Sequence, residues 1–205
     1  MLHIATVEPL TLGLLKRLMA DEKLNAFNLV GGTALSLQIG HRKSIDLDMF
    51  TQSDYEATDI LEYLISASYQ PQVKHINKQT LIIEIEGIKV DFIRFRYPFA
   101  HAIKTVEGIR LTHIEDIACM KIDAIMGRGR KKDFFDLYFL LQRFKLADIM
   151  NWYSQMYQHS TLFHVYKSLT WFDDANLDGD IDVMNKKMTW DKVKNTIIKA
   201  VEKTI

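Results

Sequence analysis

Two aspartates that stand two positions apart, Asp46 and Asp48, are the residues whose types and spacing most directly suggest chemistry. Side chains alternate along a β-strand, so both carboxylates would point to one face. Adjacent carboxylates repel each other, and burying them costs free energy unless a cation joins them. Mg²⁺ is commonly held by one or two carboxylates together with phosphate oxygens of a substrate. The pair therefore predicts a divalent-metal site, with a solvent-exposed acidic pair as the simpler alternative.

A glycine pair, Gly31 and Gly32, precedes the two aspartates. Glycine has no Cβ, so the chain can turn sharply there and approach a ligand closely. Thr33 could cap a helix that follows, and the free N–H groups at a helix start bind phosphate oxygens. We therefore expect a phosphate-binding turn between a short strand over 27–30 and a short helix.

A third acid, Asp91, stands in the middle of an apolar run at 88–95. The run is long enough for a central strand, and an acid that is buried there needs a partner or a metal. Asp91 is thus a candidate third metal ligand or general base. An ion pair with Arg94 or Arg96 is the alternative.

Basic residues follow in the next part of the chain. A capping box at 112–115 predicts a helix that runs to about residue 126, and Lys121 falls on its apolar face. A lysine in that position either extends to water or faces an anion in a cleft. The glycine-spaced basic turn at 127–132 could hold phosphate groups, or it could simply be solvated.

Acidic side chains stand out in two further segments. A helix expected over 132–143 carries Asp133 and Asp136 on one edge, where they could also complement the helix dipole. Residues 174–185 imitate a calcium loop, but Asn185 replaces its bidentate glutamate. We therefore read 174–185 as an acidic linker, with a calcium-responsive module as the rival.

A sheet half and a helical half are expected to position these residues. Strand signals end by about residue 113 and helical signals follow. We place a boundary within 100–112, which gives an α/β domain at 1–108 and a helical domain at 109–205 that closes the cleft. Further expected elements are helices over 10–24, 55–68 and 148–169 (one or two), and strands over 73–76 and 80–86.

Composition limits the classes of protein. The 205 residues carry 26 basic and 26 acidic side chains, so no global positive field indicates nucleic acid, although a local patch is still allowed. With 48% hydrophobic residues and one cysteine, Cys119, the chain can bury a core and has no internal disulfide framework. No signal peptide and no membrane-spanning run is recognisable. We expect a soluble, cytoplasmic protein without membrane partners.

The motifs together resemble those of the AbiEii/AbiGii-type toxin nucleotidyltransferases, a branch of the polymerase-β-like superfamily. Gly31 to Leu35 match the family's Gly-Gly-Thr-Ala-Leu, and His41 to Phe50 match its His-Arg-x-Ser-x-Asp-x-Asp-x-Phe. A closing Trp-x-x-Val-Lys matches Trp190 to Lys194. The family's lysine, arginine and Lys-Asp-x-x-Asp pattern matches Lys121, Arg128, Lys132, Asp133 and Asp136.

This resemblance implies an α+β fold, in which a small mixed sheet flanked by helices precedes a C-terminal helical bundle. It also implies transfer of a nucleoside monophosphate from an NTP to an acceptor hydroxyl, with Mg²⁺ or Mn²⁺. Asp46, Asp48 and Asp91 would hold the metal, and Lys121 would join them in catalysis. The implied nucleotide-binding residues are Gly31, Gly32, Thr33, Arg42, Ser44, Arg128, Lys132, Asp133 and Asp136.

The resemblance further implies an RNA acceptor, tRNA included, and a separate antitoxin protein as partner. The basic turn at 127–132 favours a polynucleotide because phosphate contacts need local positive charge. Transfer to a protein or a small molecule is an alternative acceptor chemistry. A non-catalytic nucleotide-binding or regulatory protein with the same fold is the rival function.

Overall fold

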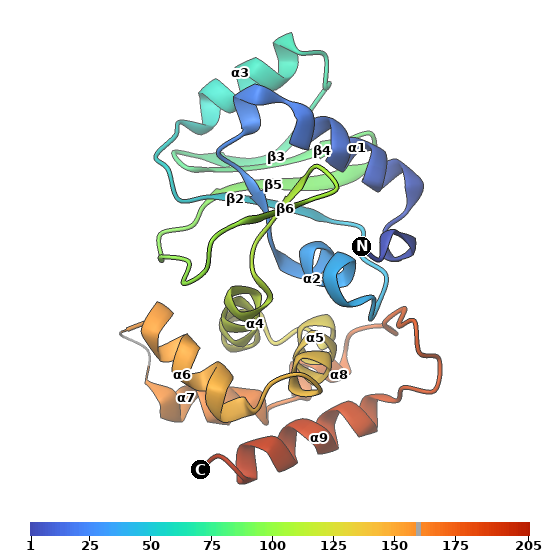
Figure 1. The fold of residues 1–205 in the computed structure, drawn as a ribbon, viewed down its shortest axis with the longest axis vertical. Coiled ribbons are helices and arrows are strands. Elements are labelled where there is room, and N and C mark those ends of the chain that lie inside the picture. Colours follow the sequence, from blue (N-terminus) through green and yellow to red (C-terminus); the bar gives the residue numbers. More distant parts are fainter. Residues whose placement is uncertain (159–160) are drawn as a thin grey trace.

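A computed structural model describes residues 1–158 and 161–205 of the chain. Figure 1 shows a sheet with its helices in the upper half of the molecule and a group of helices in the lower half. The last strand ends at Leu111 and the next helix begins at Ile114. The change from sheet to helices therefore falls just after the boundary that we expected.

The sheet is mixed and has seven strands in the order β3-β4-β5-β2-β1-β7-β6. Two pairs are parallel, β2 with β5 and β1 with β7, and the others are antiparallel. The hairpin of β6 and β7 was not predicted, and it occupies the expected linker. The strands are β1 Asn28–Leu29, β2 Leu47–Thr51, β3 Gln72–Asn77, β4 Thr80–Ile85, β5 Ile88–Arg94, β6 Lys104–Val106 and β7 Ile109–Leu111.

Three helices accompany the sheet, and the others form the lower half. Figure 1 shows α1 and α3 above the sheet and α2 below it, where α2 faces α4 and α5. Short 3₁₀ turns at Ile4–Thr6 and Glu22–Leu24 flank α1. The helices are α1 Pro9–Ala20, α2 Gly31–Ile39, α3 Ala57–Ser66, α4 Ile114–Arg128, α5 Lys131–Leu141, α6 Leu146–Met156, α7 Leu162–Leu169, α8 Asp173–Asn176 and α9 Trp190–Glu202.

The core packs against one face of the central strands, where buried side chains alternate with less buried ones on the opposite face. The alternation expected in β4 is present, since Leu81, Ile83 and Ile85 are fully buried. Phe92 of β5 is also buried and packs edge-to-face on Phe27 at 5.0 Å between ring centroids. At one edge of the sheet, all six residues of β3 are exposed, and the register shifts within this strand.

Several local predictions were wrong at element ends. Thr33 does not cap α2, because this helix already begins at Gly31, with Val30 as its N-cap. Thr112 does not open α4; His113 is the N-cap, and its Nδ1 accepts the Glu115 N–H at 3.5 Å. The expected basic turn is much shorter than 127–132, because α4 and α5 take up most of these residues.

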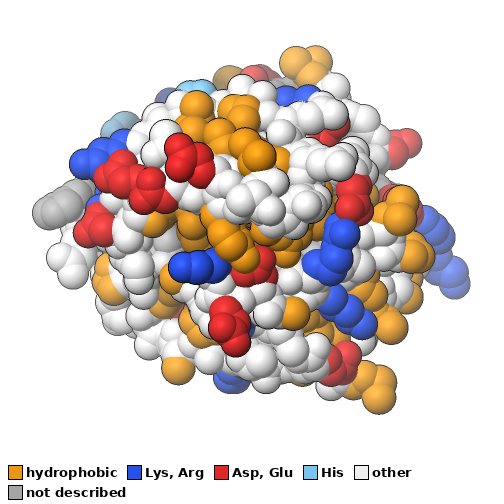
Figure 2. Space-filling model, turned by 90° about the horizontal axis from the view of Figure 1, so that it is seen from above, with side chains coloured by type: hydrophobic (Ala, Val, Ile, Leu, Met, Phe, Trp, Pro, Cys, Tyr) orange, Lys and Arg blue, Asp and Glu red, His pale blue; other side chains and the backbone are white. Residues whose placement is uncertain are grey.

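The surface agrees with a neutral chain. On the face seen from above in Figure 2, orange hydrophobic side chains lie between separate acidic and basic groups. This face therefore presents no continuous field of one sign. Within 1–158 and 161–205, no helix combines the length and the apolar character needed to cross a bilayer.

Replacing Phe92 by alanine should lower the free energy of unfolding by about 3–5 kcal/mol, because it leaves a cavity beside Phe27. Val73→Ala on the exposed strand β3 is the control, and it should change stability by no more than about 0.5 kcal/mol. Urea denaturation followed by circular dichroism measures both. Equal stability of the two variants would contradict the packing described for β5.

Candidate active site

A cavity of about 480 Å³ lies between the sheet and α4. Gly31 and Asp48 line it from the sheet half, and Lys121 and Arg128 line it from α4. The cavity thus has a carboxylate on one wall and cations on the other, which suits a polyanion bound with a metal. Aromatic and basic side chains complete the lining: Phe50, Phe95, Tyr97, Tyr157, Arg94 and Arg96.

The glycine pair makes room for two charged side chains. Gly31 has φ +68°, and a Cβ there would overlap Asp48 Oδ2. A Cβ on Gly32 would overlap a guanidinium nitrogen of Arg42. The structure therefore places Gly31 against the carboxylate wall, while Gly32 lies behind it. The first N–H groups of α2, which lack partners within the helix, start from this point.

Asp48 lines the cavity, and Asp91 lies beside it on the neighbouring strand, behind the lining. They are register partners on the parallel strands β2 and β5. Burial raises the pKa of Asp48, and the neighbouring Asp91 raises it further. Lys89 Nζ donates to Asp91 Oδ2 at 2.5 Å, and Asp91 Oδ1 is buried with no hydrogen-bond partner among the described residues. An acidic pair with an unsatisfied oxygen fits a divalent cation.

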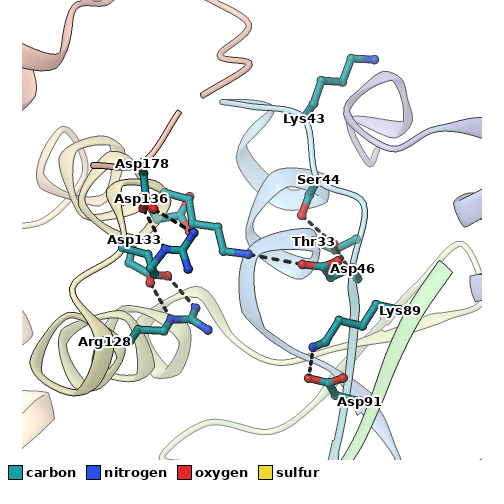
Figure 3. Close-up of polar contacts among 12 residues, drawn as sticks. Thr33, Lys43, Ser44, Asp46, Lys89, Asp91, Arg128, Asp133, Asp136 and Asp178 are labelled. Atoms are coloured by element: carbon teal, nitrogen blue, oxygen red, sulfur yellow. Dashed lines mark hydrogen bonds and ion pairs between the residues drawn. The ribbon is translucent and has the colours of Figure 1, made fainter. Parts of the chain in front are cut away.

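Asp46 stands apart from this pair. It precedes β2, and its Oδ2 lies 3.3 Å from Lys132 Nζ of α5, across the site (Figure 3). The Thr33 hydroxyl donates to the Asp46 carbonyl oxygen at 2.5 Å and shares a hydrogen bond with the Ser44 hydroxyl at 2.8 Å. Thr33 and Ser44 thus fix the backbone of Asp46, and neither lines the cavity.

The three carboxylates do not form one tight cluster in this arrangement. Over the described parts of the chain, three metal-ligating atoms approach within 4.8 Å of one another only at His101, His113 and Glu115. The ion pair with Lys132 holds Asp46 toward the helical half instead. Gathering all three acids around one ion therefore requires the Asp46 side chain to release Lys132.

Asp136 of α5 is the centre of a buried ionic network. Arg42 donates to it through Nε at 2.6 Å and Nη2 at 2.9 Å, and Lys121 Nζ lies 2.7 Å from Oδ2. Burial alone would raise the pKa of Asp136, but Arg42 and Lys121 outweigh it and hold the pKa well below its usual range. The carboxylate is therefore ionised, and it joins the loop before β2 to α4 and α5.

Asp133 extends the network toward the cavity. It accepts from Lys121 Nζ at 2.9 Å and from Arg128 Nε and Nη2 at 2.9 and 3.1 Å. Figure 3 shows Arg128 and Asp133 facing each other within the helical half. Both acids of this helix thus bind cations of the protein, and they hold Lys121 and Arg128 at the cavity wall. Arg42 itself lies behind that wall, since it does not line the cavity.

His41 belongs to the network, although we did not predict it as a site residue. Its Nε2 lies 2.7 Å from Asp136 Oδ1, and its Nδ1 is buried without a partner among the described residues. Burial lowers the pKa of His41 despite the hydrogen bond to Asp136. The ring is therefore neutral and donates from Nε2. Its position beside Arg42 in the sequence was the available signal.

The basic turn after α4 is largely occupied by the C-terminal segment. Arg130 pairs with Asp178 at 2.8 Å, and Lys131 Nζ donates to the Asp178 carbonyl oxygen at 2.5 Å. Asp182 pairs with Lys186 at 2.5 Å. The segment 174–185 is thus a connector that binds the basic turn, and its acids do not converge as a calcium loop requires.

Asp136→Asn should destabilise the protein by about 3–5 kcal/mol, because Arg42 and Lys121 would remain buried without their counterion. In the wild type, this contribution is present above the unfolded pKa of about 4 and is lost as pH falls below it. Asp191→Asn, at an exposed position, is the control and should change stability little. Denaturation at several pH values measures both effects. If Asp136→Asn lowered the free energy of unfolding no more than the control does, the description of a buried ionic network would be contradicted.

Asp48→Asn should stabilise the protein in EDTA at neutral pH. Because the folded pKa of Asp48 is raised, a bound proton favours the folded state, and this contribution is lost as pH rises through the folded pKa. An asparagine removes the repulsion from Asp91. The gain should disappear toward pH 4, where the wild-type carboxyl is also protonated. Thermal melts at both pH values test this, and a variant less stable than wild type at neutral pH would refute it.

Comparisons with known proteins agree with this geometry. The family model of the AbiEii nucleotidyl transferase toxin of type IV toxin–antitoxin systems matches residues 13–112 and 102–178. An uncharacterized protein of Aquifex aeolicus (strain VF5) is 33% identical over 184 residues, which are 87% of either chain.

Solved structures with low sequence identity share the fold. JHP933 from Helicobacter pylori has a TM-score of 0.56 at 18% identity, over 97% of this chain and 93% of its own. MenT4, a nucleotidyltransferase toxin from Mycobacterium tuberculosis H37Rv, has a TM-score of 0.56 at 13% identity, over 87% of this chain and 76% of its own. These likenesses confirm the predicted α+β fold. With the family model extending over most of its length, the chain belongs to the AbiEii family of nucleotidyltransferase toxins.

Proposed function

We propose that this enzyme transfers a nucleoside monophosphate from an NTP to a hydroxyl group of RNA, and that Mg²⁺ is its metal. The observation that carries the proposal is that Asp48 faces Lys121 and Arg128 across the cavity, with Asp91 beside it on the neighbouring strand. The unpartnered Oδ1 of Asp91 and the raised pKa of Asp48 both favour a cation there. Mn²⁺ would suit the same oxygen ligands.

Different side chains would have different roles in the reaction. Lys121 and Arg128 would bind the triphosphate oxygens, and Asp133 and Asp136 keep the two cations in place. The chemistry that Mg²⁺ supplies when bound is the neutralisation of charge that develops on the leaving pyrophosphate. Asp48 and Asp91 would hold it, and Asp46 would join them on leaving Lys132.

The acceptor hydroxyl is the nucleophile. Its oxygen forms a bond to the α-phosphorus, the α–β anhydride bond breaks, and pyrophosphate leaves. Asp91 Oδ1, which has no other partner among the described residues, can accept the hydroxyl proton. Because Lys89 binds Oδ2, Oδ1 can serve only one of the two roles: Asp91 completes the metal site or takes the proton.

The lining of the cavity supports RNA as the acceptor. Aromatic rings such as Phe95 and Tyr97 offer faces on which bases can stack, and Arg94 and Arg96 lie beside them. Arg128 lines this cavity and adds positive charge to it, although it also pairs with Asp133. Lys132 is engaged by Asp46, and Arg130 and Lys131 are engaged by Asp178. The family description, a toxin of a type IV toxin–antitoxin system, supports a cognate antitoxin as a partner.

Incubating the protein with each α-labelled NTP and Mg²⁺ should label added tRNA or total RNA. Asp46→Asn and Asp48→Asn should each lower the rate at least about 10²–10³-fold, EDTA should stop transfer, and Asp191→Asn should react as wild type. Label in protein alone would contradict the RNA acceptor. If nucleotide binds but no label moves to any acceptor, the molecule is a nucleotide-binding protein instead. If Asp48→Asn transfers as fast as wild type, the assignment of the metal site is wrong.

A further inference from the structure

A second group of metal-ligating side chains lies where the sheet half meets α4. His101 stands in the loop between β5 and β6, His113 caps α4, and Glu115 is in the first turn of α4. One ligand atom from each lies within 4.8 Å of the others, and within the described residues no other such trio occurs. The active-site cavity is not lined by any of the three.

A buried carboxylate orients His101. Asp116 is 1% exposed and accepts the backbone N–H groups of Ala100 and His101 at 2.8 and 3.1 Å. The His101 Nδ1 lies 3.3 Å from the same carboxylate. Since an ionised Asp116 can only accept, Nδ1 carries a proton, and Nε2 is the ring nitrogen that a metal ion would take. A carboxylate behind a histidine in this way is typical of metal-ligating imidazoles.

The three possible ligand atoms, one from each side chain, lie close together. His101 Nε2 lies 2.7 Å from Glu115 Oε2, and His113 Nδ1 lies 3.9 Å from the same oxygen. At 2.7 Å, His101 Nε2 and Glu115 Oε2 share a proton, which a divalent cation bound by these atoms would displace. We propose that His101, His113 and Glu115 bind a Zn²⁺-type ion, at a site separate from the acidic pair of the active site.

The donor set selects the class of metal. Two imidazole nitrogens and one carboxylate oxygen form a three-ligand site of the kind that Zn²⁺ occupies with water as the fourth ligand. Mg²⁺ instead prefers oxygen ligands and retains several waters. The chain therefore offers oxygen ligands in the cavity and nitrogen ligands at this junction.

The two imidazole rings are stacked, with centroids 4.3 Å apart and planes 21° from parallel. Their lone pairs therefore lie in nearly parallel planes, so one ring must turn before both nitrogens can point at one ion. Asp116 fixes His101, which leaves His113 as the ring that turns. The His113 side chain is 18% exposed, and its long 3.5 Å contact with the Glu115 N–H holds it only weakly. An ion bound here would tie the loop before β6 to the start of α4.

Calorimetric titration of the EDTA-treated, dialysed full chain with Zn²⁺, in excess Mg²⁺ to fill oxygen sites, tests this proposal. Wild type should bind one Zn²⁺, and the His101→Gln, His113→Gln double variant should bind it at least about 100-fold more weakly. Asp116→Asn should lose about 10–100-fold through misorientation of His101. His75→Gln, at an exposed position on β3, should bind as wild type. Co²⁺ added in place of Zn²⁺ should give the intense visible absorption of a tetrahedral site only when both histidines are present.

Equal Zn²⁺ affinity in wild type and the double variant would overturn the proposal, and so would a loss of affinity in Asp48→Asn. Circular dichroism establishes that each variant is folded. Glu115→Gln provides an independent variant that leaves both rings in place and should also weaken binding. Because no nucleotide is present in these titrations, their outcome does not depend on the transferase reaction.

Discussion

One buried carboxylate, Asp136, holds the two halves of this molecule in register. Its carboxylate oxygens lie within 2.9 Å of side-chain nitrogens of Arg42 and His41, from the loop before β2, and of Lys121, from α4. A buried charge that has no counterion lowers the free energy of unfolding by several kcal/mol, so each buried charge needs a partner. Because Arg42 must reach Asp136, residue 32 has to lack a side chain. The cavity between the halves keeps its shape for the same reason.

The two walls of the cavity differ in whether their charges are paired with opposite charges. On the helical side, Asp133 and Asp136 neutralise Lys121 and Arg128, so these cations are fixed before any ligand arrives. On the sheet side, Asp48 and Asp91 repel each other on neighbouring strands. With the proposed metal and nucleotide bound, a rigid cationic wall and a mutually repelling acidic pair would form a site that its ligands stabilise, at the expense of the stability of the empty protein.

The sequence was sufficient for most helices and strands, and insufficient for the partners of the cations. Alternation located β4, and the apolar run around Asp91 located β5 beside β2. The hairpin of β6 and β7 escaped prediction because its strands have only three residues each and carry little periodic signal. Arg42 and Asp136 were both assigned to the nucleotide, yet they bind each other across 94 positions of sequence. Nothing in the local pattern of either residue encodes such a contact.

The strand β3 at the edge of the sheet has a consequence for the behaviour of the protein in solution. All six of its residues are exposed, Val73 and Ile76 among them, and its outer backbone groups have no neighbouring strand. An open edge of this kind can recruit a strand from another chain and start aggregation. The irregular register between Val73 and His75 and the charge of Lys74 both oppose such pairing. These two features would keep the molecule monodisperse without covering the edge.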